Sequence, residues 1–139
     1  MKNLILTKEE IFSHPRTKHI ILNIDDVNYL RWQKLNERKK ITTLSLIGNA
    51  DYVMKSCEEG YSVSTTQGEF IINKDNTKNT LPINILFSIA ITMESGSSIN
   101  DVINFKYCFV WLISIIKTIY SIILINAKNY IFFYFFTTS

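Results

Sequence analysis

The stretch Lys18-His19-Ile20-Ile21-Leu22-Asn23-Ile24 decides the fold that we expect from this sequence. Its alternate positions give one aliphatic face and one face of mixed polarity, a period typical of a β-strand. The aliphatic face carries Ile20, Leu22 and Ile24, and the other face carries His19, Ile21 and Asn23. The strand needs a partner, because an isolated strand leaves its backbone N–H and C=O groups unpaired.

Two amphipathic segments follow this strand. Asp25 stands at an N-cap position, and apolar residues at helical spacing predict a first helix over about 26–38. Thr42 is placed to cap a second helix, which Gly60 is expected to end. The apolar stripe of that helix consists of Leu46, Ile47, Ala50, Val53, Met54 and Cys57. One strand and two such helices cannot bury their apolar faces within one chain, so we expect a homodimer that pairs its strands as an antiparallel ribbon.

The segment 18–57 resembles the ribbon-helix-helix family of DNA-binding proteins. The resemblance rests on the alternating strand, the Asp25-Asp26 cap, the Trp32 and Leu35 core pair, and Ile41-Thr42-Thr43 before the second stripe. It implies a ribbon-helix-helix dimer. Together with a β-hairpin and a hydrophobic C-terminal helical region expected from the sequence that follows, this dimer gives a fold class of α+β.

The same resemblance implies the site residues and the partner. A two-stranded ribbon fits the major groove of DNA, which is roughly 12 Å wide. The residues expected at base edges are His19, Ile21 and Asn23, and those expected at phosphates are Lys18, Lys40, Thr42 and Thr43. The expected function is sequence-specific regulation of transcription, by a repressor that binds double-stranded DNA as a homodimer.

The composition favours one folded unit and excludes several kinds of site. The chain has 139 residues, of which 47% are apolar, and its formal net charge is +3. That mild excess permits contact with an anionic partner without establishing one. Cys57 and Cys108 are too few and too far apart for a zinc site or a disulfide framework. We therefore expect no metal, no cofactor and no enzymatic activity.

The remaining sequence divides the chain into four parts. These are an N-terminal arm (1–17), the ribbon-helix-helix domain (18–60), a hairpin and linker region (61–104) and a hydrophobic C-terminal segment (105–139). Two β-favouring runs around Gln67-Gly68 predict a hairpin over 61–73. The apolar stretch 81–93 is too short to cross about 30 Å of hydrocarbon as a helix, so we expect it to be buried.

The segment 107–125 is the transmembrane candidate, with 15 apolar residues among 19. Lys117 opposes insertion, because a lysine near the centre costs about 2.5–3.5 kcal/mol. A buried tail and an unselected extension are the alternatives. The start of the chain lacks the apolar run of a secretory signal, which favours the cytoplasm, or a membrane anchor with the N-terminal part in the cytoplasm. Two further functions stay open: a single-pass membrane protein with a cytoplasmic protein-interaction head, and an antitoxin.

Overall fold

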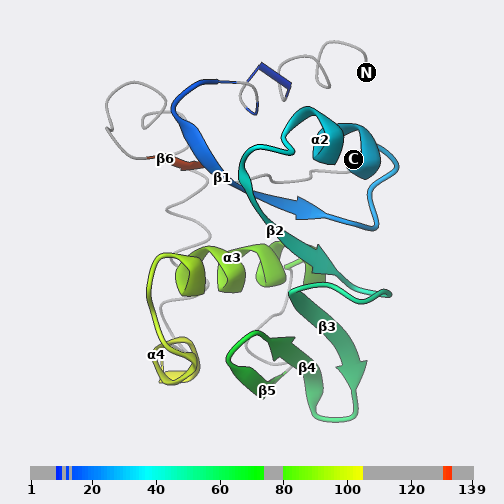
Figure 1. The fold of residues 1–139 in the computed structure, drawn as a ribbon. Coiled ribbons are helices and arrows are strands. Elements are labelled where there is room, and N and C mark those ends of the chain that lie inside the picture. Colours follow the sequence, from blue (N-terminus) through cyan, green and yellow to red (C-terminus); the bar gives the residue numbers. More distant parts are fainter. Residues whose placement is uncertain (1–8, 11, 13, 74–79, 105–129, 133–139) are drawn as a thin grey trace.

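A computed structural model shows strands β1 to β5 in a mixed sheet, with the short strand β6 at one edge (Figure 1). It describes residues 9–10, 12, 14–73, 80–104 and 130–132. The elements are β1 (Thr17–Asn23), α2 (Tyr29–Leu35), β2 (Lys40–Ser45), β3 (Tyr52–Cys57), β4 (Gly60–Thr65), β5 (Gly68–Asn73), α3 (Pro82–Glu94), α4 (Ile99–Asn104) and β6 (Tyr130–Phe132).

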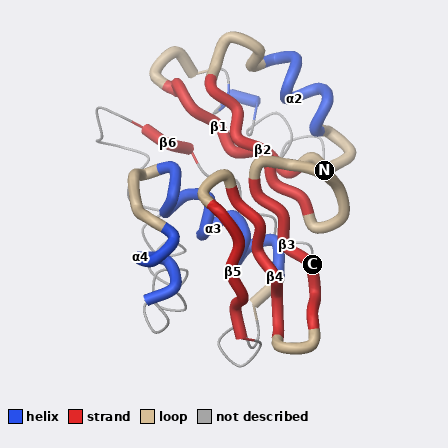
Figure 2. The backbone as a smooth tube through the Cα atoms, turned by 60° about the horizontal axis from the view of Figure 1, so that its bottom comes forward, coloured by secondary structure: helices blue, strands red, loops and turns tan. Residues whose placement is uncertain are grey.

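The strand order is β5-β4-β3-β2-β1-β6. Strands β6, β1, β2 and β3 run parallel, whereas β3, β4 and β5 form an antiparallel meander (Figure 2). Helices α2 and α3 lie on opposite sides of β1 (Figure 1). One sheet face therefore packs against α3 and α4, and the other is covered near β1 by α2.

The first strand is a central strand that is buried on both faces. Ile20, Ile21 and Leu22 are all fully buried, although alternation predicts that Ile21 faces away from the core. Helices on both sides of the sheet explain this, because a covered parallel strand presents a continuous apolar run. On the α2 side, Trp32 meets the Phe12 ring edge to face with ring centroids 5.6 Å apart.

The predicted ribbon-helix-helix dimer is wrong. The segment assigned to the second helix forms β2, a loop and β3. Strand β1 pairs with β2 on one side and β6 on the other, so neither of its edges takes the β1 strand of another copy. The first helix is also shorter than expected, covering Tyr29–Leu35.

The second predicted helix is wrong because the first half of its apolar stripe lies in the loop between β2 and β3, and the second half lies in β3. Thr42 and Leu44 in β2, then Tyr52 and Met54 in β3, are buried at every second position. β-Branched residues favour the strand conformation, and the polar turn Gly48-Asn49-Ala50-Asp51 separates the two runs.

The hairpin predicted over 61–73 is confirmed. Strands β4 and β5 pair in antiparallel register from Gly60↔Asn73 to Thr65↔Gly68, and Thr66-Gln67 forms the turn. Gly68 has a φ of +139°, which residues other than glycine rarely adopt. A second two-residue turn, Glu58-Glu59, joins β3 to β4 and was not predicted.

The buried segment predicted at 81–93 is confirmed as α3. This helix begins with Pro82 in its first turn, where the missing N–H costs no hydrogen bond. Most of its residues are buried on the sheet. No helix among the described residues is long and apolar enough to cross a membrane. The transmembrane candidate 107–125 lies outside those residues.

Candidate functional site

Two basic segments meet at the amino ends of β1 and β2. Each segment directly precedes or begins its strand, and because the strands are parallel their first residues lie at the same end of the sheet. The register pairs His19 with Lys40, which places Lys18 next to this pair. We call the group the amino-end surface, and it consists of Arg16, Lys18, Arg38, Lys39 and Lys40.

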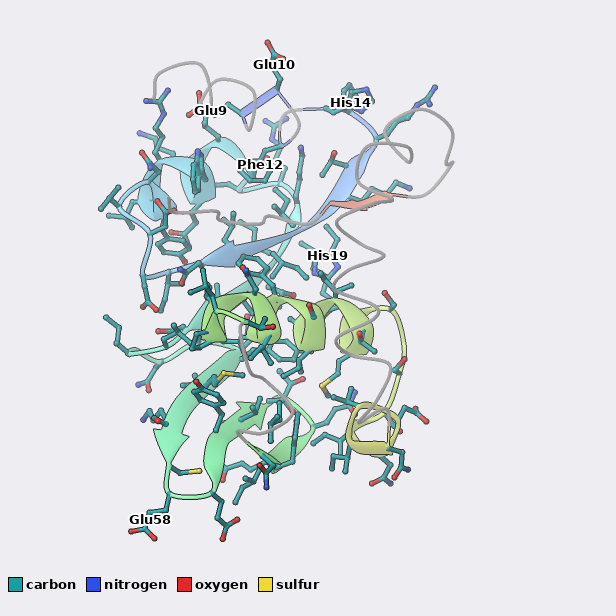
Figure 3. The ribbon with its side chains drawn as sticks, turned by 180° about the vertical axis from the view of Figure 1, so that it is seen from behind. Glu9, Glu10, Phe12, His14, His19 and Glu58 are labelled. Carbon is teal, nitrogen blue, oxygen red and sulfur yellow. The ribbon has the colours of Figure 1, made fainter. Side chains whose placement is uncertain are left out.

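Carboxylates follow the carboxyl ends of β1 and of β3, which also runs parallel to β2. Asp25 and Asp26 follow β1, and Glu58 and Glu59 follow β3. Figure 3 shows Glu58 at the far end of the molecule from His14, which precedes β1. The amino end also holds carboxylates, because Glu94 pairs with Lys40, and Glu9 and Glu10 lie at the same end of the molecule as His14 (Figure 3).

The cations of the amino-end surface differ in their contacts. Arg16, Lys18 and Arg38 are exposed. Lys40 forms an ion pair with Glu94, with Nζ and Oε2 2.6 Å apart. Lys39 is partly buried and donates from Nζ to the backbone carbonyl of Phe12, and burial lowers its pKa. Four of the five cations are therefore exposed, but Lys40 is paired with Glu94, and Lys39 binds the backbone of Phe12.

Glu94, the last residue of α3, joins the helix to three strands. Besides the Lys40 contact, its Oε1 accepts a hydrogen bond of 3.1 Å from the Tyr52 hydroxyl, and its Oε2 lies 3.6 Å from His19 Nε2. His19 lies between β1 and α3 (Figure 3). Its Nε2 is 2.8 Å from Thr42 Oγ1. We call His19, Lys40, Thr42, Tyr52 and Glu94 the Glu94 cluster.

The protonation states of this cluster follow from burial and neighbouring charge. Burial, with a smaller effect from the Lys40 charge, holds the pKa of His19 below its ordinary value of 6.5. Burial opposes ionisation of Glu94, but hydrogen bonds from Lys40 and Tyr52 outweigh it and hold the pKa of Glu94 below 4.5. Burial and then the Glu94 charge raise the pKa of Tyr52. At neutral pH the cluster holds a neutral histidine, a carboxylate, a phenol and an ammonium group.

The Glu94 cluster lacks the geometry of a nucleophile–histidine–carboxylate triad. A triad uses one imidazole nitrogen for the nucleophile and the other for the carboxylate. Here Nε2 of His19 is the atom nearest to both Thr42 and Glu94. Thr42 is also only 3% exposed, which keeps its hydroxyl from a substrate. The contacts instead anchor the end of α3 to the sheet.

The residues predicted to read bases do not form one surface. Ile21 is fully buried within β1, and His19 belongs to the Glu94 cluster. The side chain of Asn23 accepts a hydrogen bond of 3.0 Å from the backbone N–H of Asp25. The ribbon face that was expected to carry all three residues belongs to the ribbon-helix-helix fold, which is wrong for this chain.

The four residues predicted at phosphates separate into two groups. Lys18 and Lys40 both belong to the amino-end surface. Thr42 is buried in β2 and caps no helix, and Thr43 donates its hydroxyl and its backbone N–H to Asp51 Oδ2 at 2.7 and 2.8 Å. The two lysines keep a role in a candidate site, whereas the two threonines make contacts within the fold.

Asp25 has a different role from the helix cap predicted for it. Its Oδ1 accepts a 2.7 Å hydrogen bond from the Ser45 hydroxyl, and its Oδ2 accepts one of 2.7 Å from the Leu46 backbone N–H. It therefore ties the end of β1 to the loop after β2. Asn28, the residue before α2, makes no side-chain capping hydrogen bond.

Sequence reasoning missed Glu94 and Tyr52. Glu94 ends a long apolar stretch, and a single carboxylate at the end of such a stretch is normally expected to be exposed to solvent. Its three partners come from strands distant in the sequence, so no local pattern contained the signal. Within the described ranges no group of three or more His, Cys, Asp or Glu side chains is placed to hold a metal ion.

Comparisons with protein-family models, with curated proteins and with solved structures find no match to this chain.

Proposed function

We propose that this chain binds double-stranded DNA through the phosphate backbone, using the amino-end surface. The observation that carries the proposal is the parallel register of β1 and β2, which pairs His19 with Lys40 and so unites two basic segments separated in the sequence. Clustered cations on one end of a protein are the electrostatic footprint of a polyanion-binding site.

The contacts of each cation set the size of the expected interaction. Arg16, Lys18 and Arg38 are exposed, whereas Lys40 is held by Glu94 and Lys39 by backbone carbonyls. About three phosphates should therefore be neutralised. The affinity should fall with salt at a log–log slope of about −2.7, since each phosphate contributes about 0.9.

The experiment measures the fluorescence anisotropy of a labelled duplex with the full chain over a series of salt concentrations. Lys18→Gln and Arg38→Gln should each weaken binding and reduce the slope by about 0.9. Lys55→Gln is the matched control, because Lys55 is also an exposed lysine but lies on β3, away from the amino-end surface. Equal loss in all three variants, or no loss in the first two, would overturn the proposal.

The proposal assigns no base-reading residue. Phosphate contacts position a protein on DNA and carry no direct sequence information. Repression at a specific operator therefore stays a prediction, and it requires a cognate duplex to bind more tightly than a random one at equal salt. Competition between the upstream region of the gene and random DNA measures that ratio.

A second candidate function is the protein-interaction head, which three exposed aliphatic side chains favour. Val27, Leu30 and Ile47 are 97%, 74% and 83% exposed. Asp25, two residues before Val27 in the chain, holds the start of the loop that carries Ile47 against the end of β1. Ile47→Asp should abolish binding to a protein partner while leaving DNA affinity unchanged, and a variant that loses both would reject separate surfaces.

A further inference from the structure

One oxygen of Glu94 faces two side chains that can each carry a positive charge. Its Oε2 lies 2.6 Å from Lys40 Nζ and 3.6 Å from His19 Nε2. The other oxygen, Oε1, already accepts a hydrogen bond from the Tyr52 hydroxyl. A positive charge on His19 would therefore compete with Lys40 for the same oxygen.

The two competing side chains differ in their access to water. The His19 side chain is 12% exposed, lies between β1 and α3 (Figure 3), and has its Nε2 2.8 Å from Thr42 Oγ1. A charged imidazole held away from water needs a counter-charge close by. The Lys40 side chain is 65% exposed, so its ammonium group can leave Glu94 and become hydrated, and exposed ion pairs of this kind are weak. The competition therefore favours His19 once it is protonated.

The described elements packed against His19 bring one cation and one carboxylate to it. Strand β2 contributes Lys40, α3 contributes Glu94, and β6 places Ile131 opposite His19 in the register. Burial and then the Lys40 charge lower the pKa of His19, whereas the Glu94 charge acts in the opposite direction. Departure of Lys40 removes one of the two effects that oppose protonation. Protonation of His19 and release of Lys40 therefore favour each other.

We propose that protonation of His19 releases Lys40 from Glu94 and so adds a cation to the amino-end surface. This inference rests on the proposed function, because it describes the regulation of the same DNA-binding surface. With neutral His19, the surface offers the exposed Arg16, Lys18 and Arg38 to phosphates, and Lys40 joins them when His19 is charged. One more neutralised phosphate should steepen the log–log salt slope by about 0.9, which tightens DNA binding about eightfold at about 0.1 M salt.

The first experiment repeats the anisotropy titration of the full chain at about pH 7.5 and about pH 5, on either side of the ordinary histidine range. All chains carry His14→Gln, because His14 is exposed, precedes β1 and is the other histidine of the sequence. Glu94 stays ionised at both pH values, because its pKa is held below 4.5. Circular dichroism at each pH checks that the variants remain folded.

The variants assign the expected change to two side chains. The His14→Gln chain should show a slope about 0.9 steeper at the lower pH. Adding His19→Gln or Lys40→Gln should make the slope the same at both pH values. Lys18→Gln is the matched control, because it should lower both slopes and leave the difference between them intact. A slope that does not change with pH, or one that still steepens with His19→Gln or with Lys40→Gln, would overturn the proposal.

A measurement without DNA separates this inference from the proposed function. The NMR order parameter of the Lys40 ammonium nitrogen should fall toward that of Lys18 at the lower pH, and His19→Gln should prevent the fall. An order parameter that does not change with pH would overturn the release of Lys40, even if the chain binds DNA. A chain that binds no duplex at either pH would reject the proposed function, and the order parameter would still decide whether His19 displaces Lys40.

Discussion

Replacing Glu94 tests whether one carboxylate fastens α3 to the sheet. The Glu94 side chain is 12% exposed and the Lys40 side chain is 65% exposed. The Lys40 pair should therefore contribute less than about 1 kcal/mol, because solvent screens it. The Tyr52 hydroxyl is buried and donates to a charged acceptor, a hydrogen bond that typically contributes about 1.5–3 kcal/mol.

These contributions set the expected order of the variants. Tyr52→Phe should cost about 1.5–3 kcal/mol and Lys40→Gln less than about 1 kcal/mol. Glu94→Gln keeps a neutral acceptor for Tyr52 and loses the attraction to Lys40, which gives about 1–2 kcal/mol. At about 4 °C per kcal/mol for a chain of this size, its Tm should fall by about 4–8 °C.

Thermal unfolding of the full-length variants, followed by circular dichroism at neutral pH, measures these shifts. Tyr52→Phe combined with Glu94→Gln should cost less than the sum of the single changes, because both remove the same hydrogen bond. Lys55→Gln controls for the loss of a lysine outside the cluster. Additive losses, or a larger loss for Lys40→Gln than for Tyr52→Phe, would refute the assignment of Glu94 as the anchor of α3.

Three further predictions concern pH, a turn and a loop. The folded chain holds the pKa of His19 below 6.5, so the unfolded chain binds this proton at a higher pH than the folded chain does. The free energy of unfolding should therefore fall as pH drops below about 6.5. His19→Gln should remove this step from the profile of Tm against pH. Gly68→Ala should cost about 1–3 kcal/mol in denaturant unfolding because φ is +139°, whereas Gly48→Ala should cost less, since Gly48 has no such φ. Asp25→Ala should cost about 1 kcal/mol and speed hydrogen exchange at the Leu46 amide, and an unchanged exchange rate would contradict the loop contact.

The elements set by local chemistry were predictable from the sequence. The Gln67-Gly68 turn between β-favouring runs gave the hairpin, and Pro82 before a long apolar stretch gave the buried segment that became α3. The first strand was also located correctly, within one residue at its start. In each case a turn former or a run of one residue type decides the conformation without reference to distant parts of the chain.

The elements set by partners were not predictable in the same way. The apolar positions from Leu46 to Cys57 have helical spacing, but the chain there forms a loop and then β3, and β3 depends on its pairing with β2 and β4. Glu94 shows the same limit for the candidate site. Its place in the chain gives no sign of Tyr52, because the two residues meet only after α3 has packed across the sheet.

The position of Ile21 shows why a functional prediction made from strand faces has to move to strand ends. Alternation predicted that Ile21 would face a partner, but a parallel strand covered by helices on both sides has no free face. What such a strand leaves accessible are the residues just before and just after it. Parallel neighbours place all their first residues at one end of the sheet, so the register that pairs His19 with Lys40 brings Lys18 close to Lys40 through topology alone.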